Sequence, residues 1–121
     1  MNSNIDIDTL AKQVDDLIES FLVLSPEKQN VSYKANFSDK ENEQSEANKL
    51  IKKNEVKNKL CIALRSAKDD IWEISKIVVT TIAPMLITGV IVITASISWV
   101  LAIASVIIAR MGIEVYCHNC E

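Results

Sequence analysis

The residues of this chain that could do chemistry gather at its C-terminal end. Cys117, His118 and Cys120 form a Cys-x-x-Cys pair with a histidine inside it. Thiolate and imidazole groups suit zinc or copper, so the tail could supply three ligands of a tetrahedral site. A closed site needs a further ligand, and the remaining cysteine, Cys61, is distant in the sequence. We therefore expect incidental thiols and no bound cofactor, with metal or redox chemistry as the alternative.

The sequence predicts no enzyme active site. His118 is the only histidine, so a Ser–His or Cys–His catalytic pair would have to use it. The chain has three cysteines, and an odd number argues against a framework of disulfides. The tail also differs from a haem-attachment motif, in which the histidine follows the second cysteine.

The elements that must position this tail are organised around one apolar run. The 33 residues from Ile77 to Ala109 include no charged residue, His, Asn or Gln, and Lys76 and Arg110 bound the run. Uncharged apolar runs of about 18 residues or more are typical of membrane spans. One helix of this length would measure about 50 Å, against a hydrocarbon core of about 30 Å. We therefore expect a transmembrane hairpin within residues 77–116, with a single tilted span as the alternative.

The predicted hairpin has arms at about residues 71–93 and 97–116, joined at residues 94–96. The turn residues, Thr94-Ala95-Ser96, are small, and two carry hydroxyl groups that can cover exposed backbone. Aromatic and basic side chains are frequent at membrane interfaces. The predicted interface residues are Trp72, Lys76, Arg110 and Tyr116 on one side of the membrane and Trp99 on the other.

Small residues recur at helical spacing in both arms, and small faces let helix backbones approach closely in lipid. We expect these faces to hold the hairpin together, with assembly of copies into a homo-oligomer as the functional alternative. The absence of ionisable groups argues against a transporter or a pump. The predicted packing residues are Thr81, Pro84, Thr88 and Gly89 in the first arm and Ser98, Ala102, Ser105, Ala109 and Gly112 in the second.

The rest of the chain divides into four further segments, which together with the hairpin predict an all-α membrane protein. Apolar residues at spacings of three and four predict an amphipathic helix over residues 8–24, within a first segment 1–25. A polar linker (26–48) contains a strand-like alternation from Val31 to Phe37. A basic stalk helix (49–76) should run into the bilayer without a break. The Cys/His tail comprises residues 117–121.

Charge is distributed unevenly along the chain. Residues 1–48 carry a formal charge of −6, whereas residues 49–76, which adjoin the apolar run, carry +4. Basic residues beside a span mark its cytoplasmic side and attract anionic lipid. We therefore expect the cell (inner or plasma) membrane, with both termini cytoplasmic. Nucleic acid is not an expected partner, because the basic segment lacks an aromatic platform and a Gly-rich loop.

The layout also resembles a known family. A polar helical N-terminal part precedes two closely spaced apolar segments, Ile77–Ile93 and Ile97–Ala109, and a short tail that begins Arg110-Met111-Gly112-Ile113-Glu114. Over about residues 60–116 this layout resembles the bacterial two-transmembrane proteins associated with TRADD-N-like domains. The resemblance implies a membrane effector of a bacterial conflict system. A TRADD-N-like domain itself is not evident in this chain.

The sequence leaves two functions open. The first is an oligomeric membrane effector whose hairpins perturb or permeabilise the bilayer. The second is a passive membrane anchor or adaptor that recruits a cytoplasmic protein through the helix at residues 8–24. We expect the apolar stripe of that helix to pack within the chain or on a sister copy, because packing of such stripes is the general source of helical stability.

Overall fold

The computed structural model describes residues 6–24, 41–68 and 70–118, with no side chains given for residues 21–24. Within these ranges every regular element is a helix, which confirms the all-α fold class. The strand-like alternation from Val31 to Phe37 and the predicted ligand Cys120 lie outside the described residues. The helices are α1 (Ile7–Leu24), α3 (Glu41–Lys52), α4 (Asn54–Leu64), α5 (Ile71–Thr88), α6 (Ile97–Met111) and α7 (Ile113–Tyr116).

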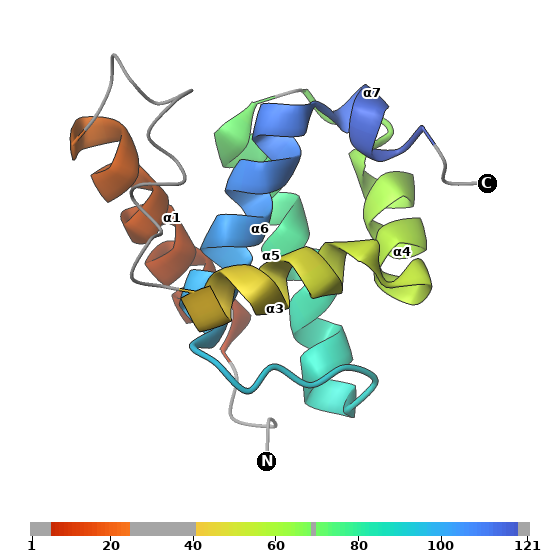
Figure 1. Cartoon of the computed structure of the whole chain (residues 1–121), viewed down its shortest axis with the longest axis horizontal. Helices are drawn as coiled ribbons and strands as arrows, with labels where there is room; N and C mark the ends of the chain where they lie inside the picture. Colours follow the sequence, from red (N-terminus) through yellow and green to blue (C-terminus); the bar gives the residue numbers. More distant parts are fainter. Residues whose placement is uncertain (1–5, 25–40, 69, 119–121) are drawn as a thin grey trace.

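Helix α6 lies at the centre of the molecule. It packs against α1, α3 and α5, and α5 in turn contacts α1 and α4 (Figure 1). The consecutive residues 100–106 are all buried. Because a helix has 3.6 residues per turn, a run of this length covers every side of α6. A helix that is apolar all round is buried in lipid or in a protein core. Here α6 is a core helix.

Amphipathic helices of the same chain cover this centre. In α1 the apolar residues Leu10, Val14 and Ile18 are buried, and the acidic residues between them are exposed. Asp6 caps this helix, because its carboxylate accepts hydrogen bonds from the Asp8 amide and the Thr9 hydroxyl. The predicted amphipathic helix therefore exists, and its stripe packs within the chain.

The predicted continuous stalk helix is wrong. Helix α3 begins at Glu41, inside the predicted polar linker, and ends at Lys52. Lys53 then adopts an extended conformation before α4, and Asp70 does so before α5. The physical reason is burial, since α3 and α4 each turn an apolar face to the core. Those faces are Ala47, Leu50 and Ile51 in α3, and Val56, Leu60, Cys61 and Leu64 in α4.

The chain has two glycines, and each ends a helix of the predicted hairpin. Gly89, at φ 82°, closes α5, and Gly89 and Val90 donate hydrogen bonds to the carbonyls of Leu86 and Met85. This is the Schellman pattern of helix C-termini. Gly112, at φ 96°, ends α6. The predicted arms 71–93 and 97–116 are therefore too long, and the connection is residues 89–96.

Helix α5 is the one described helix that is long and apolar enough to cross a membrane, by length and composition. In this structure 44% of its apolar window is buried inside the molecule. Helix α6 is also apolar but has 15 residues, about 22 Å. The structure thus contains one candidate span, with its predicted partner arm enclosed by the chain.

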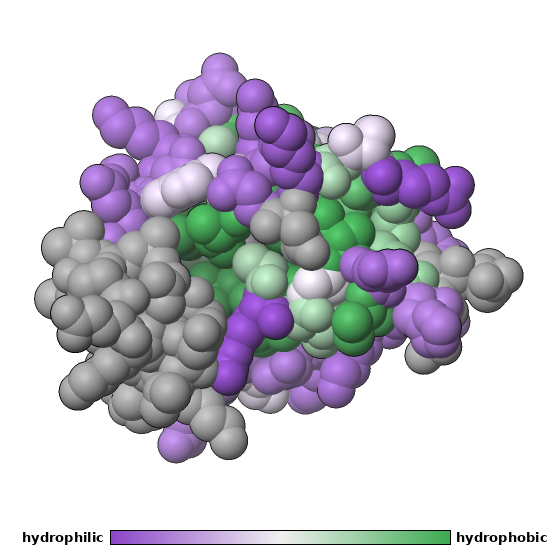
Figure 2. Space-filling view, turned by 90° about the horizontal axis from the view of Figure 1, so that it is seen from above, coloured by the Kyte–Doolittle hydropathy of each residue, from purple (hydrophilic) through white to green (hydrophobic). Residues whose placement is uncertain are grey.

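Some apolar side chains remain at the surface. Val90 and Val92, in the connection between α5 and α6, are 55% and 70% exposed. Figure 2 views the molecule from the top of Figure 1, where α6 ends, and shows hydrophobic residues at the surface between hydrophilic ones. At that end Met111 of α6 and Val115 of α7 are exposed. Both ends of the α5–α6 unit therefore present apolar surface.

Candidate functional site

The candidate site is the set of contacts that hold the outer helices on α5 and α6. We call α5, α6 and the connection 89–96 the apolar pair, and α1, α3, α4 and α7 the shell. The two helices of the apolar pair run in opposite directions (Figure 1). Among the described residues, four fastening contacts between residues far apart in the sequence carry the argument below. Three are polar and one is covalent.

The first contact joins α1 to α5. The Ser75 hydroxyl, which is buried, lies 3.2 Å from Asp15 Oδ1 and 3.0 Å from the Trp72 carbonyl oxygen. Ser75 donates its one proton between these two acceptors, so the hydroxyl is satisfied whether or not α1 is present. The Asp15 contact therefore helps to fix the orientation of α1. The attachment of α1 comes mainly from the apolar surface that Leu10, Val14 and Ile18 bury.

The second contact joins α3 to the connection of the apolar pair. The Glu46 carboxylate accepts a hydrogen bond from the Thr94 amide at 3.1 Å and from the Thr94 hydroxyl. The Ala95 amide lies 3.5 Å from the same carboxylate. These donors come just before α6 begins at Ile97. A shell side chain thus holds the apolar connection in place.

The hydrogen bond from the Thr94 hydroxyl lowers the pKa of Glu46 below its ordinary value of 4.5. Partial burial acts in the opposite direction, and the backbone amides and Lys49 lower the pKa further. A lowered folded-state pKa means that the contact stabilises the fold above the ordinary glutamate pKa. That stabilisation is lost as the pH falls through the lowered value.

We predict that Glu46→Gln lowers the melting temperature at neutral pH and removes part of its pH dependence. The glutamine side chain is neutral, and its NH₂ group cannot accept a hydrogen bond as the second carboxylate oxygen does, so the connection is held less well. The difference between wild type and Glu46→Gln should shrink as the pH falls below about 4.5. Melting curves from pH 3 to 7 measure it.

Glu41→Gln is the matched control, because Glu41 is exposed in the first turn of the same helix. A Glu46→Gln difference that stays constant over this pH range would contradict the role of the ionised carboxylate.

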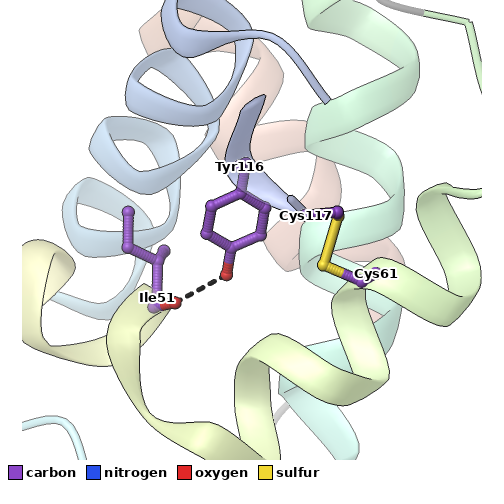
Figure 3. The surroundings of a disulfide bond; sticks show 4 residues. All are labelled: Ile51, Cys61, Tyr116 and Cys117. Carbon is purple, nitrogen blue, oxygen red and sulfur yellow. Dashed lines mark hydrogen bonds between the residues drawn. A yellow bond between two sulfur atoms is a disulfide. The ribbon is translucent and has the colours of Figure 1, made fainter. Parts of the chain in front are cut away.

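The third contact joins α7 to α3. Tyr116 is buried, and its hydroxyl donates a 2.6 Å hydrogen bond to the Ile51 carbonyl (Figure 3). Ile51 lies in the last turn of α3, where carbonyl groups lack partners within the helix. The Lys57 ammonium lies 5.3 Å from the centre of the Tyr116 ring, within range of a cation–π contact. Tyr116, predicted for a membrane interface, is here an internal anchor for the short helix α7.

The fourth contact is covalent. Cys61 of α4 and Cys117, directly after α7, form a disulfide with a Cα–Cα distance of 5.7 Å (Figure 3). The prediction of incidental thiols is therefore wrong for Cys117. Sequence separation misled that prediction, because the fold brings together two residues that are 56 positions apart.

The disulfide also removes Cys117 as a thiolate ligand for a metal ion. His118 is exposed beside it. Among the described residues no cluster of three or more His, Cys, Asp or Glu side chains could hold a metal ion. The structure thus assembles no ligand set from the described part of the tail.

The predicted packing residues fall into two groups. In α6, Ala102 and Ser105 are fully buried, and the Ser105 hydroxyl bonds the Leu101 carbonyl of its own helix at 2.8 Å. The small residues of α6 thus allow close approach to neighbouring helices of the same chain. In the first arm, Thr81 is half-buried. The other three predicted residues of that arm, Pro84, Thr88 and Gly89, are exposed. The other three of the second arm, Ser98, Ala109 and Gly112, are half-buried.

The predicted interface residues lie at the two ends of the apolar pair. Trp72 and Lys76, in the first turns of α5, and Arg110, near the end of α6, are exposed. Trp99 is half-buried in the first turn of α6. Because α5 and α6 run in opposite directions, Trp72 and Arg110 share one end of the pair and Trp99 lies toward the other. Their contact with a membrane remains a prediction.

Sequence reasoning missed the fastening residues Asp15, Glu46 and Cys61. Asp15 and Glu46 look like ordinary solvent-facing acids of amphipathic helices, and nothing local identifies their partners.

Comparisons of this chain with protein-family models, with curated proteins and with solved structures found no match. The resemblance to TRADD-N-associated membrane proteins therefore remains an expectation from layout alone.

Proposed function

We propose that this protein is a membrane effector that stores its apolar pair inside an amphipathic shell and delivers it to a bilayer. The observation that carries the proposal is the enclosure of α6. A helix with no ionisable residue before Arg110 is surrounded by α1, α3 and α5 of the same chain. The shell contributes the polar surface that keeps this helix away from water.

The apolar pair meets the physical demands of a bilayer. Its helices satisfy their own backbone groups, and the connection 89–96 carries no charge to transfer across the membrane. Helices α5 and α6, of 18 and 15 residues, measure about 27 and 22 Å. Both are shorter than a hydrocarbon core of about 30 Å. Short spans thin the surrounding bilayer, which favours perturbation of the membrane.

The structure gives less support to an adaptor that recruits a partner through α1. The apolar stripe of α1 is already buried against α5 and α6. A partner would have to displace it or bind the acidic outer face. Storage of the apolar pair needs α1 to pack on α5 and α6, as it does in this structure. Separation of α1 from the pair then starts insertion.

Dye release from vesicles tests the proposal. The full chain should release a trapped dye from vesicles of phosphatidylethanolamine and phosphatidylglycerol, and less dye from vesicles of phosphatidylcholine alone. The acidic lipid attracts the basic residues of α3 and α4. In cells, induced expression should cause rapid loss of membrane potential. Harmless accumulation together with intact vesicles would contradict the effector and leave a helical core protein or an anchor.

A shell that cannot open should abolish dye release. Asp15→Cys with Ser75→Cys places two thiols where the native side chains meet, in a chain that also carries Cys120→Ser. The oxidised crosslinked protein should be inactive on vesicles, and Ser75→Cys alone should retain activity. Equal release by the two proteins would exclude separation of α1 and α5 as a step in insertion.

We predict that both termini of the inserted protein face the cytoplasm. The expectation rests on the uncharged connection 89–96 and on the basic residues that flank the apolar pair. Reporter fusions at each end, one active only in the cytoplasm and one only outside it, provide the measurement. An external C-terminus would indicate a single span and exclude insertion as a pair.

A further inference from the structure

The Cys61–Cys117 disulfide faces a pocket of about 450 Å³ at the surface. Both cysteines line this pocket, together with the charged or ionisable side chains of Arg65, Glu114 and His118. Cys61 is buried, whereas Cys117 is half-buried. A structural disulfide packed in a core is shielded from reductants, but this one can be approached from solvent through the pocket.

We propose that this pocket is a thiol–disulfide exchange site, at which a dithiol reductant opens the Cys61–Cys117 bond and releases α7 from α4. The exchange itself stands apart from the proposed membrane function. Its effect on vesicles rests on that function.

The exchange needs one dithiol and proceeds in two steps. A thiolate of the reductant attacks Cys117 Sγ, the less buried sulfur, and the Cys61 sulfur leaves with the electron pair of the broken bond. The second thiol of the reductant, as a thiolate, then attacks the reductant's first sulfur, which is bonded to Cys117 in the mixed disulfide. Cys117 leaves as a thiolate. The chain gains two electrons and two protons, and the reductant becomes a disulfide.

Arg65 is placed to assist both charged sulfurs. It follows Cys61 by four positions and keeps helical backbone angles, so the two side chains lie on the same face of α4. Its cation in the pocket wall attracts the incoming thiolate and stabilises the leaving Cys61 thiolate, and it offsets the repulsion from the Glu114 carboxylate in the same wall. The Arg65 side chain is exposed and lies outside the apolar core. Its replacement should therefore change the rate of thiol–disulfide exchange without destabilising the fold.

Opening the bond leaves α7 weakly held. This helix has four residues, too few for a stable helix without tertiary contacts. Its contacts besides the disulfide include the hydrogen bond from the buried Tyr116 to the Ile51 carbonyl and the cation–π contact of Lys57 with the Tyr116 ring. Helix α7 also packs on α6, so its release uncovers the end of the apolar pair. In a reducing compartment, protein disulfides are usually transient and act as redox sensors.

The test uses the full chain with Cys120→Ser, so that two cysteines remain. The rate of reduction by dithiothreitol is followed by alkylation and mass spectrometry. Arg65→Gln should slow reduction about threefold, the effect of losing one nearby charge at high dielectric. The control is Lys68→Gln, which loses the same charge from an exposed residue outside the pocket wall and should not change the rate. Equal rates for the two variants would overturn the role of Arg65 and of the pocket.

Hydrogen exchange reports the release of α7. On reduction the amides of Tyr116, Cys117 and His118, which donate to the carbonyls of residues 112, 113 and 115, should lose protection, while those of residues 100–106 keep it. The double variant Cys61→Ser, Cys117→Ser should show the same pattern without reductant and no response to it. Unchanged protection of the amides of residues 116–118 after full reduction, or absence of the bond in the oxidised chain, would overturn the proposal.

Dye release separates this proposal from the proposed function. Faster release after reduction supports both. Normal exchange kinetics and release of α7, in a chain that releases no dye whether oxidised or reduced, would contradict the membrane function and leave the exchange site standing. Dye release that is insensitive to reductant, in a chain that fails to exchange, would contradict the exchange site alone.

Discussion

Replacing Ile18 by Asp is expected to detach α1 from the apolar pair. Ile18 is fully buried in the stripe that α1 turns toward α5 and α6. The change removes the burial of a large apolar side chain and places an unpaired carboxylate in its position. Each effect destabilises a fold by several kcal/mol, and the total free energy of unfolding of a small domain is about 5–15 kcal/mol. The two effects together should therefore remove most of the free energy that holds α1 on the pair.

Hydrogen exchange and dye release provide the measurement. In Ile18→Asp the amides of α1 should exchange rapidly while those of residues 100–106 remain protected, and dye release should begin at lower protein concentration. Gln13→Asp is the control, because it adds the same charge at an exposed position of α1. If Ile18→Asp loses protection in α1 but releases dye no faster than Gln13→Asp, detachment of α1 does not expose a membrane-active segment.

Ala102→Leu is expected to disrupt the packing of α6. Ala102 is fully buried in the helix that α1, α3 and α5 surround, and leucine adds three carbon atoms to a filled core. Overpacking of this kind costs about 1–3 kcal/mol. Ser105→Leu should act in the same way and also remove the hydroxyl that bonds the Leu101 carbonyl. Urea denaturation gives the change in the free energy of unfolding.

The control must come from a less enclosed position of α6. Ile103 is fully buried like Ala102, so residues 100–106 present no tolerant face. Ile107 is half-buried, and Ile107→Leu conserves volume, so it should change the free energy of unfolding by less than about 1.5 kcal/mol. Crosslinking in membranes with the same variants tests assembly of copies. Identical stability and identical crosslinked species for Ala102→Leu, Ser105→Leu and Ile107→Leu would leave the small-residue face without a role.

The sequence alone determined the helical class, the amphipathic first helix and the position of the apolar run. These follow from local signals, because the spacing of apolar residues selects a helix and one of its faces. Local residues, Gly89 and Gly112, also determine where the two helices end, since only glycine adopts those positive φ angles readily. The predicted arms ran past both glycines because each arm was given the length that a membrane span needs.

The tertiary structure decided what covers the apolar run. Lipid and a protein core are both apolar, so the same residue pattern fits either environment, and only the docking of α1 and α3 selects the second. It also decided the fastening contacts, because Glu46 and Thr94, and Cys61 and Cys117, are 48 and 56 positions apart. Pairings at such distances depend on the directions that α3, α4 and α5 take relative to one another, with a change of direction at Lys53. No local signal fixes those directions, because burial of the faces of α3 and α4 against α5 and α6 sets them.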